Sequence, residues 1–152
     1  MHDQQEALWK LSATELARRY RERSLTPLAV AYDVLARIDA VNGRLNAVVS
    51  RRDDAVLAEA QAAGERFARG VPLSMLDGIP LTVKDSLYLD GLPTTCGTPA
   101  LVAHEPGHDE LAAARAREAG ALILGKTNVP EFANDGYTAN PVFGVTGNPW
   151  AP

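Results

Sequence analysis

The chain has 152 residues, of which 46% are hydrophobic and 22% are charged, and its formal net charge is −4. This composition is typical of a globular domain with its own core, and the acidic balance argues against a nucleic-acid partner. The single cysteine excludes an internal disulfide framework and is typical of a reducing compartment. The polar stretch "MHDQQEALWK" has no apolar signal core, and no apolar run approaches the ~20 residues of a membrane span. We therefore predict a cytoplasmic protein without a membrane partner.

The first part of the chain carries the signals of three helices. Ser12 is followed three residues later by a glutamate, which is the spacing of a capping box, and predicts the start of the first helix. Thr26 and the proline after it predict the start of the second helix, and Gly43 is expected just past its end. A short extended piece is expected at residues 45–50, before a third helix over residues 53–70. The apolar residues that share one face of this third helix are Val56, Ala60, Ala63 and Phe67.

Beyond the third helix, the composition shifts toward glycine, proline and threonine. The stretch "IPLTVKD" at residues 79–85 predicts a strand, and residues 109–120 predict an alanine-rich helix with Asp109 as its N-cap. The apolar run "ALILG" at residues 121–125 has the length and composition of a buried parallel strand. The C-terminal residues are rich in Gly, Asn and Pro, which predicts turns.

This order of elements predicts an α/β fold, because helices come first and a strand–helix–strand unit follows. We expect a helical N-terminal segment over residues 1–70 and the first part of an α/β domain over residues 71–152, the two belonging to one domain. No internal repeat and no low-complexity tract interrupts this order.

The stretch "GALILGKT" at residues 120–127 matches the pattern G-x-x-x-x-G-K-T of a phosphate-binding P-loop. A P-loop requires a strand before the glycines and a helix after the lysine, because the loop N–H groups must converge on phosphate. Here a predicted helix comes first, and the four residues between the glycines have strand character. Gly120 is better explained as the residue that ends the preceding helix. Nucleotide binding is therefore the last of the functions we consider.

Other chemically suggestive residues have simpler explanations. His104 and His108 have a spacing that faces one way on a helix, but the proline and glycine between them break a helix, so we expect a solvated loop and no metal site. Glu131 follows Asn128 at capping-box spacing, which favours a helix cap over a general base. Cys96 is expected to be a small residue in a tight loop rather than a nucleophile.

Only three of the 15 basic residues are lysines, and Lys84 is the one in the most informative position. It follows the uncharged strand residues 79–83, and Asp85 should point to the opposite face of the strand. If Lys84 is buried there without a partner, desolvation favours its neutral amine, which arginine cannot supply. The alternative is a lysine that extends to the surface or pairs with a distant carboxylate.

Two longer stretches closely resemble the amidase signature family. The first, "DGIPLTVKDSLYLDGLPTTCGTPAL", contains the blocks G-I-P-x-x-x-K-D and T-T-x-G. The second, "DELAAARAREAGALILGKTNVPEFANDGYTANPVFGVTGNPW", contains A-G-A-x-x-x-G-K-T-N-x-x-E-F and N-P-W. The blocks occur in the family's order and at its spacing, and they cover roughly residues 70–152. Several separate blocks are far more specific than one motif.

The resemblance implies hydrolysis of a carboxylic amide by a Ser–cis-Ser–Lys triad without a cofactor. Lys84 falls on the family's catalytic lysine, which takes a proton that the nucleophilic serine releases through the cis-serine, and water then hydrolyses the acyl-enzyme. Lys126 falls in the G-K-T-N block, which is structural or pocket-forming. The implied fold is a mixed sheet with flanking helices, and the implied partners are a small-molecule amide substrate and, through the N-terminal helices, a possible second copy of the chain.

The sequence departs from the family in one respect. The family's Gly/Ser-rich segment, which supplies the cis-serine and is followed by the nucleophile and the oxyanion hole, begins shortly after N-P-W, and the chain reaches only Pro152. We expect a truncated amidase that needs the missing C-terminal part of the same protein and is inactive alone. The alternatives are the amidase subunit of a tRNA-dependent amidotransferase and a non-catalytic fragment with a structural or binding role. The serines that do not match the family's positions are Ser12, Ser24, Ser50, Ser74 and Ser86.

Overall fold

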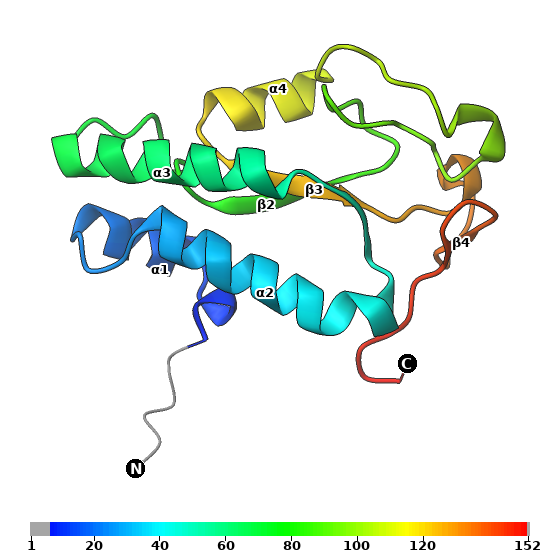
Figure 1. Cartoon of the computed structure of the whole chain (residues 1–152), viewed down its shortest axis with the longest axis horizontal. Helices are drawn as coiled ribbons and strands as arrows, with labels where there is room; N and C mark the ends of the chain where they lie inside the picture. The colour runs from blue at the N-terminus through cyan, green and yellow to red at the C-terminus, as the bar shows by residue number, and fades with distance from the viewer. Residues whose placement is uncertain (1–6, 152) are drawn as a thin grey trace.

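The structure is a computed structural model that describes residues 7–151. Three helices occupy the first half of the chain as predicted (Figure 1). The Ser12 hydroxyl accepts a hydrogen bond from the Glu15 N–H at 3.1 Å, and the Thr26 hydroxyl accepts one from the Ala29 N–H at 3.2 Å. Both expected N-caps are confirmed. The short N-terminal 3-10 helix and the three α-helices are η1 (Leu8–Lys10), α1 (Ala13–Arg21), α2 (Pro27–Leu45) and α3 (Asp53–Arg69).

Helix α2 runs past the glycine that we expected to end it. It continues to Leu45, and Asn46 follows in the left-handed conformation with φ of 50°. The Asn42 side chain explains this end: its oxygen accepts hydrogen bonds from the N–H groups of Ala47 and Val48, both at 2.9 Å. These bonds turn the chain toward the sheet at Asn46, one of the few residue types that tolerate a positive φ. The prediction for Gly43 was therefore wrong.

A three-stranded mixed sheet forms the centre of the fold. The strands lie in the order β1-β3-β2, so β3 is central, parallel to β2 and antiparallel to β1. The predicted buried parallel strand is confirmed, and it extends further than expected, through the G-K-T residues. The strands are β1 (Val48–Arg51), β2 (Pro80–Lys84) and β3 (Leu122–Thr127).

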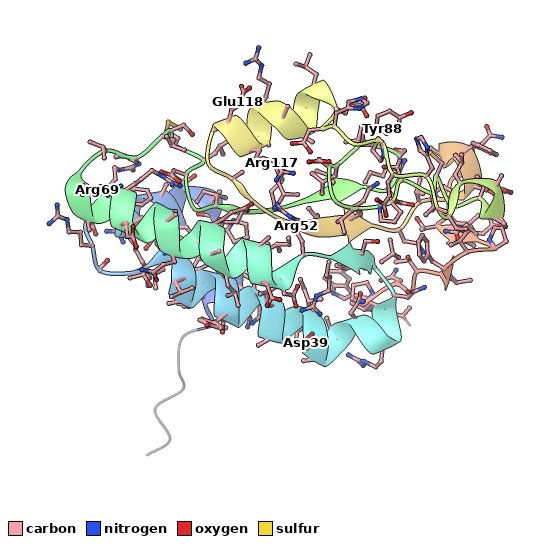
Figure 2. The ribbon with its side chains drawn as sticks, turned by 45° about the horizontal axis from the view of Figure 1, so that its top comes forward. Asp39, Arg52, Arg69, Tyr88, Arg117 and Glu118 are labelled. Atoms are coloured by element: carbon pink, nitrogen blue, oxygen red, sulfur yellow. The ribbon has the colours of Figure 1, made fainter. Side chains whose placement is uncertain are left out.

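Each face of the sheet is covered by different helices. Leu122 and Leu124 of β3 pack with buried residues of α2 and α3, whereas Ile123 packs with Ala113 of α4 (Leu111–Glu118). Figure 1 shows α4 and α2 on opposite sides of the strands. The predicted apolar face of α3 is confirmed, because all four of its residues are buried. Charged groups join the helices at the periphery, where Glu59 accepts a hydrogen bond from Arg52 at 2.7 Å and lies 3.9 Å from Arg117 of α4 (Figure 2).

Two predicted caps are not formed. Glu110, not Asp109, is the N-cap of α4, because the Asp109 carboxylate binds the Arg117 guanidinium at 2.7 and 3.0 Å and accepts the Asp90 N–H at 2.8 Å. The Asn128 side chain instead donates to Thr146 and Gly144, and Glu131 is exposed. The Asp109 carboxylate thus binds the last turn of α4 and the preceding loop, and the Asn128 amide binds the C-terminal segment, in place of the helix ends that local spacing had assigned.

The C-terminal part consists mainly of turns, as predicted. It carries the short 3-10 helix η3 (Glu131–Ala133) and a two-stranded antiparallel ladder, whereas the 3-10 helix η2 (Pro99–Leu101) precedes α4, and Trp150 near the end is 90% exposed. A loop between β2 and α4 leads into this region and packs beside it. The strands of the ladder are β4 (Ala139–Asn140) and β5 (Gly144–Val145).

Candidate active site

Two lysines reach the carboxyl end of the parallel strand pair, where open α/β sheets commonly bind ligands. Lys84 is the last residue of β2 and pairs with Thr127 of β3. Lys126 is the partner of Val83, one residue earlier in the same ladder. Because paired residues point to the same face and successive residues alternate, the two lysine side chains leave the sheet on opposite faces.

Lys84 is exposed on the surface that residues 7–151 form, which is the second of the two alternatives that its sequence position left open. Val83 is the residue whose side chain enters the core, beside Ile123, so strand alternation turns Lys84 away from that core. Among residues 7–151, no ion pair involves the Lys84 ammonium. The expectation that Asp85 would not pair with Lys84 is confirmed, because its carboxylate binds a different lysine.

Lys126 owes its direction to an irregularity in β3. The register with β2 shifts between Leu81 and Thr82, so that β3 carries one extra residue. A bulge of this kind reverses the faces of the residues that follow it and places Lys126 on the side of Ile123 instead of the side of Leu124. Gly125 makes the close approach possible: a Cβ there would lie 2.0 Å from the Ser50 oxygen of β1.

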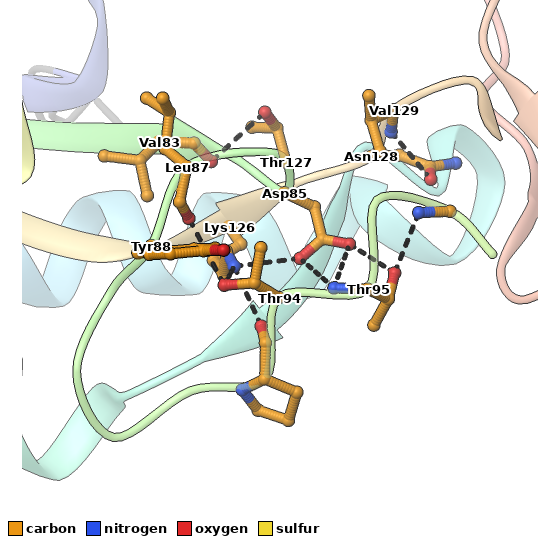
Figure 3. A network of polar contacts seen from close by, with 12 residues as sticks. Val83, Asp85, Leu87, Tyr88, Thr94, Thr95, Lys126, Thr127, Asn128 and Val129 are labelled. Carbon is orange, nitrogen blue, oxygen red and sulfur yellow. Dashed lines mark hydrogen bonds and ion pairs between the residues drawn. The ribbon is translucent and has the colours of Figure 1, made fainter. Parts of the chain in front are cut away.

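The Lys126 ammonium is completely buried and fully hydrogen-bonded (Figure 3). It donates to the Pro93 carbonyl at 2.8 Å and to the Thr94 hydroxyl at 2.6 Å, and it lies 3.0 Å from Oδ1 of Asp85. These three acceptors match the three N–H donors of an ammonium. Burial lowers the pKa of Lys126, and the hydrogen bond to Asp85 acts in the opposite direction.

The Asp85 carboxylate is as completely buried as its lysine partner. It accepts hydrogen bonds from the Thr95 hydroxyl and from the Thr95 N–H, the latter at 3.3 Å to Oδ2. The Thr95 hydroxyl also accepts the Gly97 N–H at 3.0 Å, and the Thr94 hydroxyl contacts the Leu87 carbonyl at 3.4 Å. The pair therefore ties the end of β2 to the threonine-rich loop. Sequence reasoning noticed neither Asp85 nor the two threonines as partners of Lys126, although the K-D and T-T-x-G blocks contain all three.

Cys96 lies in this loop, as predicted for a small residue in a tight turn, with φ of 49°. Its N–H donates to the Asp85 carbonyl at 3.3 Å, and its carbonyl accepts the Phe132 N–H at 2.8 Å. Burial raises the pKa of the Cys96 thiol, and the Asp85 carboxylate adds to this increase. A thiol with a raised pKa is a poor nucleophile near neutral pH.

The other candidate motifs behave as local structure. His104 and His108 both lie at the edge of the Tyr88 ring, with centroids 5.6 and 5.4 Å away. No group of three or more metal-ligating side chains occurs in the part of the chain that the structure describes. Gly120 follows α4, with φ of 88°, and precedes the buried strand β3. This helix–strand order is the reverse of the strand–helix order that a P-loop requires, as predicted. None of the described helices is long and apolar enough to cross a membrane.

Comparison with solved structures shows which class this fold belongs to. The native peptide amidase from Stenotrophomonas maltophilia superposes with a TM-score of 0.83 and 32% identity, over 93% of this chain and 30% of that chain. The fold is thus part of an amidase fold. A family model described as Amidase matches residues 29–152, and the chain belongs to the amidase signature family.

Curated relatives agree with this assignment. A glutamyl-tRNA(Gln) amidotransferase subunit from Streptomyces coelicolor is 40% identical over 141 residues, which cover 93% of this chain and 28% of the relative. An acylamidase from Rhodococcus erythropolis is 40% identical over 146 residues, which cover 92% of this chain and 29% of the relative. The chain therefore spans less than a third of the length of the relatives that it matches.

Proposed function

We propose that this chain is the part of an amide hydrolase that carries the lysine base of a Ser–cis-Ser–Lys triad. The reaction is the hydrolysis of a carboxylic amide to an acid and ammonia or an amine. The observation that carries this proposal is the position of Lys84 at the carboxyl end of β2, within the K-D block of the family. Lys126 does not fit this role, because its buried ammonium already uses each of its donors.

The role of Lys84 in the proposed reaction is to accept one proton. The nucleophilic serine would lose its proton through the cis-serine to the Lys84 amine as its oxygen attacks the amide carbon. The same proton would then return to the leaving nitrogen when the C–N bond breaks, so Lys84 ends the acylation step neutral. Water would cleave the resulting ester by the same sequence. The two serines belong to the family's Gly/Ser-rich segment, so the activity is proposed for a protein that includes it.

This proposal is tested by measuring the hydrolysis of a simple aryl amide by the longer protein that includes the Gly/Ser-rich segment, which we call the complete enzyme. Lys84→Ala is expected to abolish turnover, and Lys84→Arg should fail equally because a guanidinium does not release its proton in proteins. Loss of a member of such a triad typically lowers kcat by about 10⁴–10⁶-fold. A fully active Lys84→Ala enzyme would refute the assignment of Lys84 as the base. The isolated 152-residue chain is expected to show no turnover.

The similarity to the Streptomyces coelicolor protein is the observation behind a second candidate, the amidase subunit of an amidotransferase. The two candidates differ in their need for partner proteins. Hydrolysis of a free small amide without any partner supports the hydrolase. Activity that appears only with partner proteins and glutamyl-tRNA(Gln) supports the amidotransferase.

A further inference from the structure

We propose that Asp85 and Lys126 are positioning residues, whose buried ion pair fixes the backbone at Lys84 against the threonine-rich loop of residues 93–97. This inference rests on the proposed function, in which Lys84 is the base. Neither side chain of the pair faces the same side of the sheet as Lys84, so their effect passes through the main chain.

The main chain around Lys84 is hydrogen-bonded on both sides. The Leu87 N–H donates to the Lys84 carbonyl at 2.9 Å, and the Asp85 N–H donates to the Thr127 carbonyl at 2.9 Å. The Asp85 carbonyl in turn accepts the Cys96 N–H at 3.3 Å. The backbone of Lys84 and Asp85 is therefore held by the central strand at the Asp85 N–H and by the loop at the Asp85 carbonyl.

The side chains of the pair determine where that loop lies. Asp85 binds Thr95 through both its N–H and its hydroxyl, and Lys126 binds Pro93 and Thr94. Both charged groups have 0% exposure. Two apolar residues could fill the same volume without loss of stability, but they would offer no directed hydrogen bonds. The hydrogen-bonded pair is therefore suited to fixing the position of the loop relative to the end of β2. Buried polar groups have such a role in specifying one arrangement of two segments in other proteins.

A lysine base depends on such a support because its side chain is long and has many rotamers. Within residues 7–151 the fold sets only the Cα position and the Cα–Cβ direction of Lys84, because no hydrogen bond or ion pair there holds its side-chain nitrogen. A displacement of about 1 Å at a reacting group can lower a rate by about 10²-fold. Movement of the turn after β2 would displace Lys84 directly.

The chain contains a matched control at the other end of β2. Asp77 is also completely buried, and its carboxylate binds the Arg66 guanidinium at 2.9 and 2.6 Å. This pair joins α3 to the segment before β2, and no hydrogen bond or ion pair among residues 7–151 connects it to the loop of residues 93–97. Removing it should affect stability without moving Lys84.

The test compares two double variants of the complete enzyme, which includes the Gly/Ser-rich segment, in steady-state amide hydrolysis. Asp85→Leu with Lys126→Met replaces the pair by apolar residues and should lower kcat by about 10²-fold while KM stays within about twofold, because substrate contacts are unchanged. Asp77→Leu with Arg66→Met should keep kcat within about twofold of the parent. Full kcat in the first double variant, or an equal loss in both, would overturn the inference.

Two single variants cover the case in which the first double variant does not fold. Thr95→Val removes the hydroxyl that donates to Asp85, and Thr95→Ser restores it. We expect Thr95→Val to lower kcat by about tenfold and Thr95→Ser to recover most of this loss, because one hydrogen bond to a charged group is involved. Equal kcat in both variants would contradict a positioning role.

Hydrogen exchange of the 152-residue chain provides a readout that does not depend on catalysis. At matched global stability, the Leu87 and Cys96 amides should exchange about tenfold faster in the Asp85/Lys126 double variant than in the Asp77/Arg66 double variant. Equal protection would refute the inference. A fully active Lys84→Ala enzyme would instead refute the proposed function, whereas loss of activity in Lys84→Ala with full kcat in the Asp85/Lys126 variant would refute only the positioning role.

Discussion

Two buried carboxylates bracket strand β2, and they are partnered in different ways. Asp77 precedes the strand and binds Arg66, whose side chain keeps 21% of its surface exposed. Asp85 follows the strand and binds Lys126, whose side chain is 0% exposed. The carboxylates are equally buried, so the difference lies in the cation and in what surrounds it.

The comparison shows what each cation contributes. The Arg66 guanidinium presents a planar pair of donors to Asp77 and keeps part of its side chain exposed, so this cation loses less hydration on burial than Lys126 does. The Lys126 ammonium is compact and has lost its water entirely, so it requires acceptors from the protein on every donor. Those acceptors come from Pro93 and Thr94 in addition to Asp85. The lysine pair therefore organises a loop, whereas the arginine pair anchors a helix.

The largest expected effect is on the fully buried pair. Asp85→Ala leaves the Lys126 ammonium in the core without its counter-charge and should lower the free energy of unfolding by about 3–5 kcal/mol. Urea denaturation followed by circular dichroism measures this change. A loss below about 1 kcal/mol, typical of an exposed ion pair, would show that the Lys126 ammonium does not depend on Asp85.

A smaller loss is expected at the other end of β2. Asp77→Ala should lower the free energy of unfolding by about 1.5–3 kcal/mol, because it removes the carboxylate that accepts the hydrogen bonds of Arg66. The Arg66 side chain left behind is 21% exposed, so its guanidinium can bind water. The same denaturation experiment applies. If this variant is destabilised more than Asp85→Ala, the contrast between the two pairs is wrong.

A weaker, pH-dependent effect is expected at the exposed cluster on α1. Hydrogen bonds from Arg18 and Arg19 lower the pKa of Glu15 from its ordinary value of 4.5 to about 2. A lowered carboxylate pKa stabilises the folded chain above pH 4.5, and this contribution disappears as the pH falls toward 2. The stability difference between the parent chain and Glu15→Gln should therefore be small and salt-sensitive at pH 7. A difference that grows on acidification would contradict this assignment.

The smallest expected effect is that of the exposed lysine. Lys84→Ala should change the free energy of unfolding by no more than about 0.5 kcal/mol, as is usual for exposed positions without special contacts. Thermal and urea unfolding of the variant beside the parent chain measure it. A large destabilisation would mean that Lys84 supports the fold, and would weaken any interpretation of its loss of activity.

Local signals predicted much of the fold. The caps at Ser12 and Thr26 and the apolar face of α3 depend on residues within a few helical turns, and each is present. The expectations for Asp109 and Asn128 failed because the Asp90 N–H binds the Asp109 carboxylate and the Asn128 amide binds Thr146. Capping patterns describe only what a segment can do alone, and tertiary contacts override them where a stronger partner is near.

In the candidate site, too, local sequence signals predicted some features and tertiary contacts determined the others. The sequence by itself determined that Lys84 ends a strand, since an uncharged strand pattern and a turn flank it, and that the chain carries the blocks of an amidase. Only the tertiary structure decided which lysine is buried. That outcome depends on the bulge at Gly125, where the backbone of β3 passes so close to Ser50 that no side chain fits. The bulge turns Lys126 inward to meet Asp85, and no local pattern in either segment encodes the approach of the other.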